Sequence, residues 1–145
     1  MFMGEYNHTI DPKGRVIIPA KFREELGERF TIAKGMNDGC LFLYPEGEWQ
    51  KLAEEFKKAP LIHPLMRKFV REFFSGSDGT EMDKQGRALV PQNLREYAGI
   101  EKDCVVIGAM TRVELWSKER WDARENEPLD MDEVAEVLAE YGISI

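Results

Sequence analysis

The stretch that decides the fold is Asp11-Pro12-Lys13-Gly14-Arg15-Val16-Ile17-Ile18-Pro19, because a second copy follows at Asp83-Lys84-Gln85-Gly86-Arg87-Ala88-Leu89-Val90-Pro91. The offset is 83 − 11 = 72 residues, and it holds without a gap through the rest of the unit, as in Arg23/Arg95, Leu43/Leu115 and Trp49/Trp121. One register kept over so long a span indicates an internal duplication. The chain therefore consists of two copies of one small unit.

The composition is that of a soluble globular protein, since 43% of the 145 residues are hydrophobic and 32% are charged. No apolar run approaches the roughly 20 residues that cross a bilayer, and the N-terminus lacks a basic stretch followed by an apolar one. The two cysteines, Cys40 and Cys104, occupy different places in the repeat, which favours small buried thiols in a reducing compartment. We therefore expect a cytoplasmic protein.

The net charge of −7 argues against a nucleic-acid partner until its distribution is considered. Seven acidic residues lie between Glu125 and the C-terminus, where lysine and arginine are absent. Residues 1–124 therefore hold 27 − 7 = 20 acidic residues against 20 basic ones. A neutral body can carry a basic face, and the local potential decides what binds there.

Each unit is expected to contain two strands, a short helix and a second hairpin. The alternation over residues 6–10 predicts a half-buried strand, Asp11 to Gly14 a turn, and residues 15–18 a second strand, so that the pair forms a hairpin. In the second copy the corresponding strands are 80–82 and 87–90. The helices are expected between Pro19 and Gly27 and between Pro91 and Gly99, and the later hairpins at 30–34/41–44 and 104–107/113–116.

The buried positions of the two short helices follow from their spacing. Phe22 and Leu26 lie four residues apart on one face of the first helix, and Leu94 and Ala98 take these places in the second. The remaining charged residues of the first helix are expected in solvent, namely Lys21, Arg23, Glu24 and Glu25.

Three further helices are expected, two between the units and one after them. Residues 46–58 are expected to form an amphipathic helix, a second one begins at Pro64, and a third lies in the acidic tail. Asp130 caps the tail helix, with Glu133 three residues further on. The apolar stripe of the tail helix consists of Val134, Val137, Leu138 and Tyr141.

The sequence does not predict an enzyme. The motifs GxGxxG and HExxH, the Walker loop and the GxSxG elbow are absent. His8 lies within an alternating strand and His63 before a helix, and neither has a recurring carboxylate or cysteine partner. We therefore expect no catalytic residues, no metal and no cofactor.

The duplicated turn is the candidate site. Asp11, Gly14, Asp83 and Gly86 form the turns, because aspartate bonds the following backbone and glycine tolerates positive φ. Lys13, Arg15, Lys84 and Arg87 form a cluster of four cations on the two tips, which Arg23 and Arg95 extend. If a pseudo-twofold axis relates the units, these cations meet DNA phosphates or guanine edges on one face. A plain scaffold, in which each arginine only pairs with its aspartate, is the alternative.

The sequence also resembles the MraZ family, bacterial transcriptional regulators with two SpoVT–AbrB-type domains in one chain. The residues that carry the resemblance are Phe2-Met3-Gly4-Glu5-Tyr6, His8-Thr9-Ile10-Asp11, Lys13-Gly14-Arg15, Ile18 to Arg23, Asp83 to Arg87, Leu94-Arg95 and Val113 to Trp116. Both Asp-x-x-x-Arg motifs match. The resemblance carries the family's DNA-binding arginines to Arg15 and Arg87; Lys13 matches a neighbouring position, and Lys84 follows from the repeat.

The resemblance implies an α+β fold, mainly β with short helices, in which tandem swapped-hairpin (double-split) β-barrel units are related by an internal pseudo-twofold. It implies ring-like homo-oligomers that bind double-stranded DNA at short direct repeats upstream of the division and cell wall gene cluster, usually as a repressor in the nucleoid. We expect domain 1 at 5–47, a helical linker at 48–76, domain 2 at 77–120 and an acidic tail at 121–145. A structural interaction ring and an antitoxin-like protein-binding module remain the alternatives.

Overall fold

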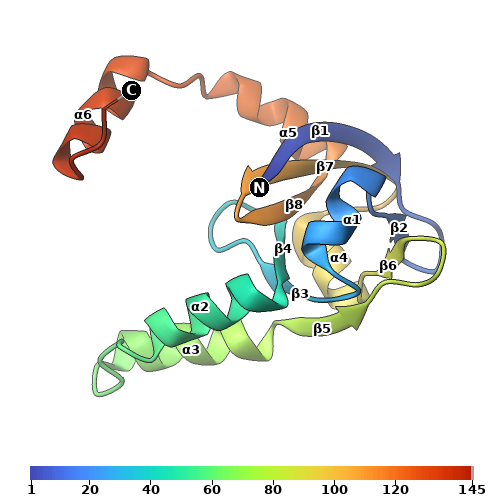
Figure 1. Ribbon diagram of the computed structural model, residues 1–145, viewed down its shortest axis with the longest axis horizontal. Coiled ribbons are helices and arrows are strands. Elements are labelled where there is room, and N and C mark those ends of the chain that lie inside the picture. The colour runs from blue at the N-terminus through green and yellow to red at the C-terminus, as the bar shows by residue number, and fades with distance from the viewer. Residues whose placement is uncertain (145) are drawn as a thin grey trace.

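The two repeats build one sheet and one ribbon together. In the computed structural model, which describes residues 1–144, the strands are β1 (Phe2–Thr9), β2 (Arg15–Ile17), β3 (Arg29–Lys34), β4 (Leu41–Pro45), β5 (Asp78–Glu81), β6 (Arg87–Leu89), β7 (Asp103–Met110) and β8 (Arg112–Ser117). Six strands form a sheet in the order β1-β7-β8-β4-β3-β5, and β2 and β6 form a separate two-stranded ribbon (Figure 1). All of these pairings are antiparallel.

Strands are exchanged between the repeats. β1 of the first repeat pairs with β7 of the second, β5 of the second pairs with β3 of the first, and β2 pairs with β6. The order of the sheet reads the same from either edge when each strand is replaced by its counterpart in the other repeat. This confirms the expected α+β fold with an internal pseudo-twofold.

The expected partner of the first strand was wrong. β1 and β2 share only an isolated bridge between Ile10 and Val16, and the two strands then diverge to β7 and to β6. The alternation of apolar residues identifies a strand and its buried face, but it does not identify the strand beside it. The expected strand at 80–82 likewise lies at β5 and pairs with β3.

The 72-residue offset does not hold without a gap, as the sequence predicted, because β7 is shifted by two residues relative to β3. Phe30 faces Pro45 in the first hairpin, and Cys104 faces Ser117, the counterpart of Pro45, in the second. The offset between β3 and β7 is therefore 104 − 30 = 74 residues, although it is 72 on both sides of these strands. The second repeat has two extra residues before β7 and a turn between β7 and β8 that is shorter by the same number. The offset between the repeats is therefore 72 residues again at β8.

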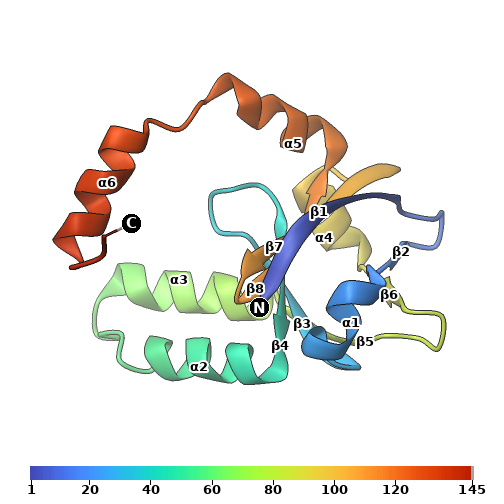
Figure 2. The same ribbon diagram turned by 45° about the horizontal axis from the view of Figure 1, so that its top comes forward.

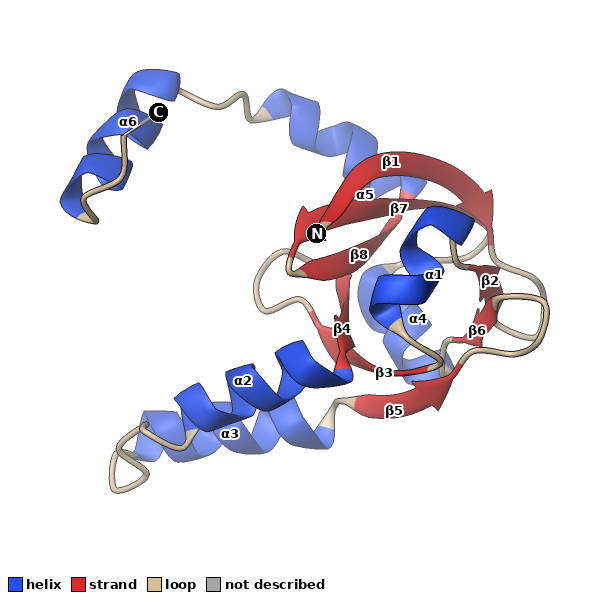
Figure 3. Cartoon of the chain, viewed as in Figure 1, coloured by secondary structure: helices blue, strands red, loops and turns tan. Residues whose placement is uncertain are grey.

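The short helices cover the sheet next to the ribbon. α1 (Ala20–Leu26) buries Phe22 and Leu26, and α4 (Gln92–Ala98) buries Leu94 and Ala98, as predicted. These side chains join the main core, which lies between the ribbon and the inner face of the sheet. Figure 3 shows both helices enclosed between the long strands and the ribbon.

A helical arm extends from the barrel. α2 (Glu46–Phe56) and α3 (Pro64–Ser75) lie side by side and project away from the ribbon (Figures 1 and 2). An aromatic cluster joins them to the sheet, with Trp49 stacked on Phe73 at 5.7 Å between ring centroids and Phe56 edge-on to Phe69. None of the helices within residues 1–144 has the length and apolar character that a membrane span requires.

The C-terminal segment leaves the barrel in the other direction. α5 (Lys118–Ala123) and the 3-10 turn η1 (Arg124–Asn126) lead to α6 (Met131–Glu140), which stands clear of the body (Figure 2). The Asp130 carboxylate accepts hydrogen bonds from the backbone N–H groups of Asp132 and Glu133, so the predicted cap is confirmed. Ile145, the last residue of the predicted tail, lies outside the described residues.

Candidate nucleic-acid interface

One face of the β2–β6 ribbon is exposed to solvent, and it carries both charged and apolar side chains. Arg15 faces Leu89, Val16 faces Ala88, and Ile17 faces Arg87. Because side chains alternate along a strand, Val16 and Ala88 point into the core while the other four side chains point outward. Ile17 and Leu89 are 44% and 52% exposed, so two large apolar side chains lie beside the two arginines on this outer face.

Each outward arginine is held by the aspartate of its own turn. The Oδ1 atom of Asp11 accepts hydrogen bonds from the backbone N–H groups of Lys13 and Arg15, and Oδ2 accepts from Nε of Arg15 at 2.6 Å. Asp83 binds the backbone of Gln85 and Arg87 in the same way, and its Oδ2 lies 2.8 Å from Nε of Arg87. The two sites therefore have the same internal geometry.

This geometry leaves the ends of both guanidinium groups available. Within residues 1–144 neither the hydrogen bonds nor the ion pairs involve Nη1 or Nη2 of Arg15 or Arg87; each pair uses Nε. The carboxylate fixes one edge of the guanidinium group, and the two Nη atoms form a preorganised pair of donors. Such a pair matches two acceptors on a phosphate or on a guanine edge.

The hydrogen bonds lower the pKa of both aspartates. The backbone N–H of Arg15 is the largest cause for Asp11, and that of Arg87 for Asp83, in each case aided by the arginine side chain. A pKa lowered in the folded state means that the folded protein binds fewer protons than the unfolded chain. The carboxylates therefore stabilise the fold above their ordinary pKa of 3.8, and this contribution is lost as the pH falls through the folded-state values.

We therefore expect the melting temperature of the wild-type protein to fall more steeply below pH 3.8 than that of Asp11→Asn/Asp83→Asn. Thermal unfolding followed by circular dichroism across a pH series measures the difference between the two proteins. If the ionised carboxylates stabilise the turns, the difference in melting temperature between the two proteins becomes smaller as the pH falls. A difference that is constant with pH would show that their ionisation contributes nothing.

The two predicted lysines are not at equivalent positions of the repeat. Lys13 and Lys84 are exposed on their turns and, within residues 1–144, neither is in an ion pair. Gln85 is the counterpart of Lys13, because the backbone N–H of each donates to the aspartate two residues before it. Gln85 was not among the residues predicted from the sequence, although the 72-residue offset identifies it. Ile17 and Leu89 were not predicted either, because their exposure follows only from the pairing of the ribbon.

Arg23 and Arg95 do not extend the strip of cations. Arg23 was expected in solvent, but it is half-buried, and its Nε donates to the carbonyl of Ile18 at 2.8 Å. Its guanidinium group lies against Gly86 of the other repeat, where a Cβ atom would overlap it. Arg95 packs on Gly14 reciprocally and donates to the carbonyl of Val90. Each of these arginines therefore supports the turn that carries the opposite Asp–Arg pair.

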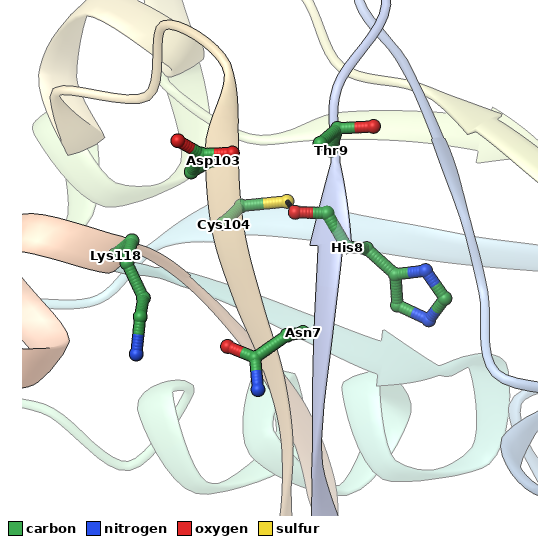
Figure 4. A pocket seen from close by; sticks show the side chains of 6 residues that line it. All are labelled: Asn7, His8, Thr9, Asp103, Cys104 and Lys118. Carbon is green, nitrogen blue, oxygen red and sulfur yellow. Dashed lines mark hydrogen bonds between the residues drawn. The ribbon is translucent and has the colours of Figure 1, made fainter.

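A second surface feature, a pocket of about 510 Å³, lies along β1 and β7 (Figure 4). The Cys104 thiol donates to the carbonyl of His8 at 3.4 Å, and burial raises its pKa to about 12, so the thiol is protonated. The imidazole of His8 points away from Cys104 in Figure 4, and Lys118 is bound to Asp122. This pocket therefore lacks an activated nucleophile. No group of three metal-binding side chains occurs in the described part of the chain.

The strand exchange and the paired Asp–Arg turns define a tandem-repeat protein of the swapped-hairpin barrel class. Comparison with known families gives a match to "MraZ protein, putative antitoxin-like" over residues 1–72 and again over residues 73–138. The chain belongs to this family. The boundary between the two matches agrees with the internal duplication.

The relatives of this chain are similar over their whole length. The transcriptional regulator MraZ of Clostridium acetobutylicum is 55% identical over 143 residues, which cover 99% of this chain and 100% of the relative. The proteins of the same name from Clostridium beijerinckii and Caldicellulosiruptor bescii are each 54% identical, again covering 99% of this chain and 100% of the relative.

Proposed function

We propose that this protein is a transcriptional regulator that binds double-stranded DNA through the β2–β6 ribbon. The observation that carries the proposal is the outward face of the ribbon, where two aspartate-fixed arginines stand diagonally across the strands from each other. The naming of the relatives as transcriptional regulators supports it. Lys13, Arg15, Lys84 and Arg87 are the proposed DNA-binding residues, and Asp11, Gly14, Asp83 and Gly86 form their turns.

The shape of the ribbon suits the major groove. That groove is about 12 Å wide and admits a two-stranded antiparallel ribbon. Diagonal neighbours across such a ribbon lie about 7–8 Å apart at Cα, so Arg15 and Arg87 reach adjacent positions on the DNA. Their Nη atoms donate to O6 and N7 of guanine, while Ile17 and Leu89 contact the methyl groups of thymine. Lys13 and Lys84, on the flanking turns, bind phosphates.

The finer biological setting follows from the family resemblance. The target is a set of short direct repeats upstream of the division and cell wall gene cluster, the effect is repression, and the protein works in the cytoplasm on the nucleoid. A homo-oligomeric ring presents several ribbons to successive repeats, which raises avidity without any new contact. The division of the chain at 5–47, 48–76, 77–120 and 121–145 stays a prediction.

Fluorescence anisotropy tests the proposal. We expect the protein to bind DNA from upstream of its own gene more tightly than scrambled DNA of equal length, with the logarithm of the affinity falling linearly with the logarithm of salt concentration. The slope arises from counterions that the phosphate contacts release. Equal or negligible binding to both DNAs, with the protein folded, would contradict the proposal.

A protein-binding role is the second candidate. None of the residues of the acidic α6 is buried in the described structure, and Val137 on its apolar stripe is 49% exposed, as expected of a helix that docks on a protein. An interaction ring without DNA binding, or an antitoxin-like contact with a basic partner, uses this helix. A small toxin encoded next to the gene would favour the antitoxin-like module.

A further inference from the structure

The two turns of the ribbon have the same geometry but carry different side chains. In each turn the aspartate side chain accepts hydrogen bonds from the backbone N–H groups two and four residues further on, and the glycine N–H donates to the aspartate carbonyl. The residue two positions after the aspartate therefore has the same place in both turns. This residue is Lys13 in the first turn and Gln85 in the second, and both side chains are exposed.

The two turns lie at opposite ends of the ribbon, because β2 and β6 are antiparallel. At one end the backbone N–H of Val90 donates to the carbonyl of Gly14, and at the other end that of Ile18 donates to the carbonyl of Gly86. The basic and amide side chains follow along the ribbon in the order Lys13, Arg15, Arg87, Gln85. Their positions are thus symmetric about the pseudo-twofold axis, whereas the outer two side chains differ.

Net charge does not distinguish the two ends of the ribbon. Each turn, counted from its aspartate to its arginine, holds one carboxylate, one lysine and one arginine, because Lys84 precedes Gln85 whereas Pro12 precedes Lys13. The attraction of the two ends to DNA phosphates is therefore similar. A preference of one end for a particular base has to come from the hydrogen-bonding groups.

The amide of Gln85 has a hydrogen-bonding capacity that the ammonium of Lys13 lacks. A glutamine side chain both donates and accepts, which matches N7 and the N6 amino group of adenine in the major groove. A lysine ammonium only donates, so it binds a phosphate or the acceptors of guanine. Among the hydrogen bonds within residues 1–144, Gln85 contributes its backbone N–H, and its side-chain amide takes part in none. Both groups of the amide are therefore available to a base.

The second turn holds Gln85 in a fixed position. Its backbone N–H donates to Oδ1 of Asp83 at 2.9 Å. Gly86, which follows it, has a φ of +78°, and the guanidinium group of Arg23 lies against this glycine. Nε of Arg23 also donates to the carbonyl of Ile18 at 2.8 Å. Because the turn is already ordered, a contact made by Gln85 costs less conformational entropy than one made from a flexible loop.

We propose that Gln85 contacts the edge of an adenine at one end of the DNA site, while Lys13 binds a phosphate at the equivalent place of the other end. The ribbon then binds DNA in one orientation, although its strands and its two arginines are related by the pseudo-twofold. The inference rests on the proposed DNA binding through the ribbon. It adds the residue that specifies one end of the site.

Coupled changes in protein and DNA test the contact. In a single repeat of the upstream DNA, each adenine is replaced in turn by 7-deazaadenine, in which a C–H group takes the place of N7. We expect one such replacement to weaken binding of the wild type by about two- to tenfold, as the loss of one hydrogen bond does, and to leave binding of Gln85→Ala unchanged. Lys13→Ala is the matched control and is expected to keep the wild-type response. Equal responses of the wild type and Gln85→Ala at every adenine would overturn the inference.

A tethered cleavage reagent tests the orientation. Cys40 and Cys104 are buried, so the new thiol of Glu101→Cys is the one that reacts, and Glu101 shares a surface pocket with Pro12 of the first turn. An iron chelate attached there cleaves DNA next to the first turn. We expect cleavage on one side of the site.

The exchange variant Lys13→Gln/Gln85→Lys keeps the net charge and moves the amide to the first turn. In the Glu101→Cys protein we expect this exchange to move the cleavage to the opposite side of the site. Cleavage on both sides, or on one side without a change in the exchange variant, would overturn the inference and leave the proposed function intact. A protein that binds the repeat no more tightly than scrambled DNA would contradict the proposed function, and the inference with it. Circular dichroism checks that each variant is folded.

Discussion

Replacing Arg15 and Arg87 together by alanine is expected to weaken binding to the upstream DNA by about thirtyfold or more, because each bidentate arginine–guanine contact is worth about 1–3 kcal/mol. Preference over scrambled DNA is expected to fall with the affinity, since these donors contact base edges in the proposed complex. Each single variant is expected to lose about fivefold or more in affinity. We expect the fold to survive, because Asp11 and Asp83 keep their bonds to the backbone N–H groups that shape the turns.

The measurement is anisotropy at one salt concentration, with circular dichroism as the check on folding. Lys57→Ala/Lys58→Ala is the matched control, because it removes two cations from the end of α2, away from the ribbon (Figure 1). It is expected to change affinity little. Unchanged affinity in Arg15→Ala or in Arg87→Ala would remove that arginine from the site, and an equal loss in the lysine control would reduce the effect to net charge.

Gly108→Ala is expected to cost about 3 kcal/mol of folding stability and to lower the melting temperature by about 10 °C. Gly108 on β7 faces Gly4 on β1. A Cβ atom there would overlap the backbone N of Met3 and lie 2.5 Å from the carbonyl carbon of Phe2. A backbone cannot yield as a flexible side chain does, so β1 has to move away from β7. This pairing is one of those that join strands of the two repeats.

Gly79→Ala is the matched control for this change, because Gly79 also lies in an exchanged strand, β5, and a Cβ atom there meets nothing within 4 Å. It is expected to leave the melting temperature unchanged or slightly raised, since alanine restricts the unfolded chain more than glycine does. Thermal unfolding of the wild type, Gly108→Ala and Gly79→Ala under the same conditions measures the three melting temperatures. Equal melting temperatures for wild type and Gly108→Ala would show that β1 adapts without loss.

Several features of the fold could be predicted because they are local. Turn residues, the four-residue spacing of Phe22 and Leu26 and the Asp130 cap all act within a few positions along the chain. The 72-residue repeat also made it possible to predict the pseudo-twofold axis. The same local signals predicted the wrong partner for β1. The alternation of apolar and polar residues specifies which face of a strand is buried, but it does not specify which strand lies beside it.

The candidate site also has a part that local sequence determines and a part that long-range packing determines. The sequence by itself determined the two Asp–Arg turns, since each carboxylate bonds groups two and four residues along its own chain. Only the tertiary structure decided that the turns share one ribbon, that Ile17 and Leu89 join its outer face, and that Arg23 and Arg95 support the turns of the opposite repeat. The physical reason is range: these contacts join residues about one repeat apart, and long-range packing sets them rather than local propensity.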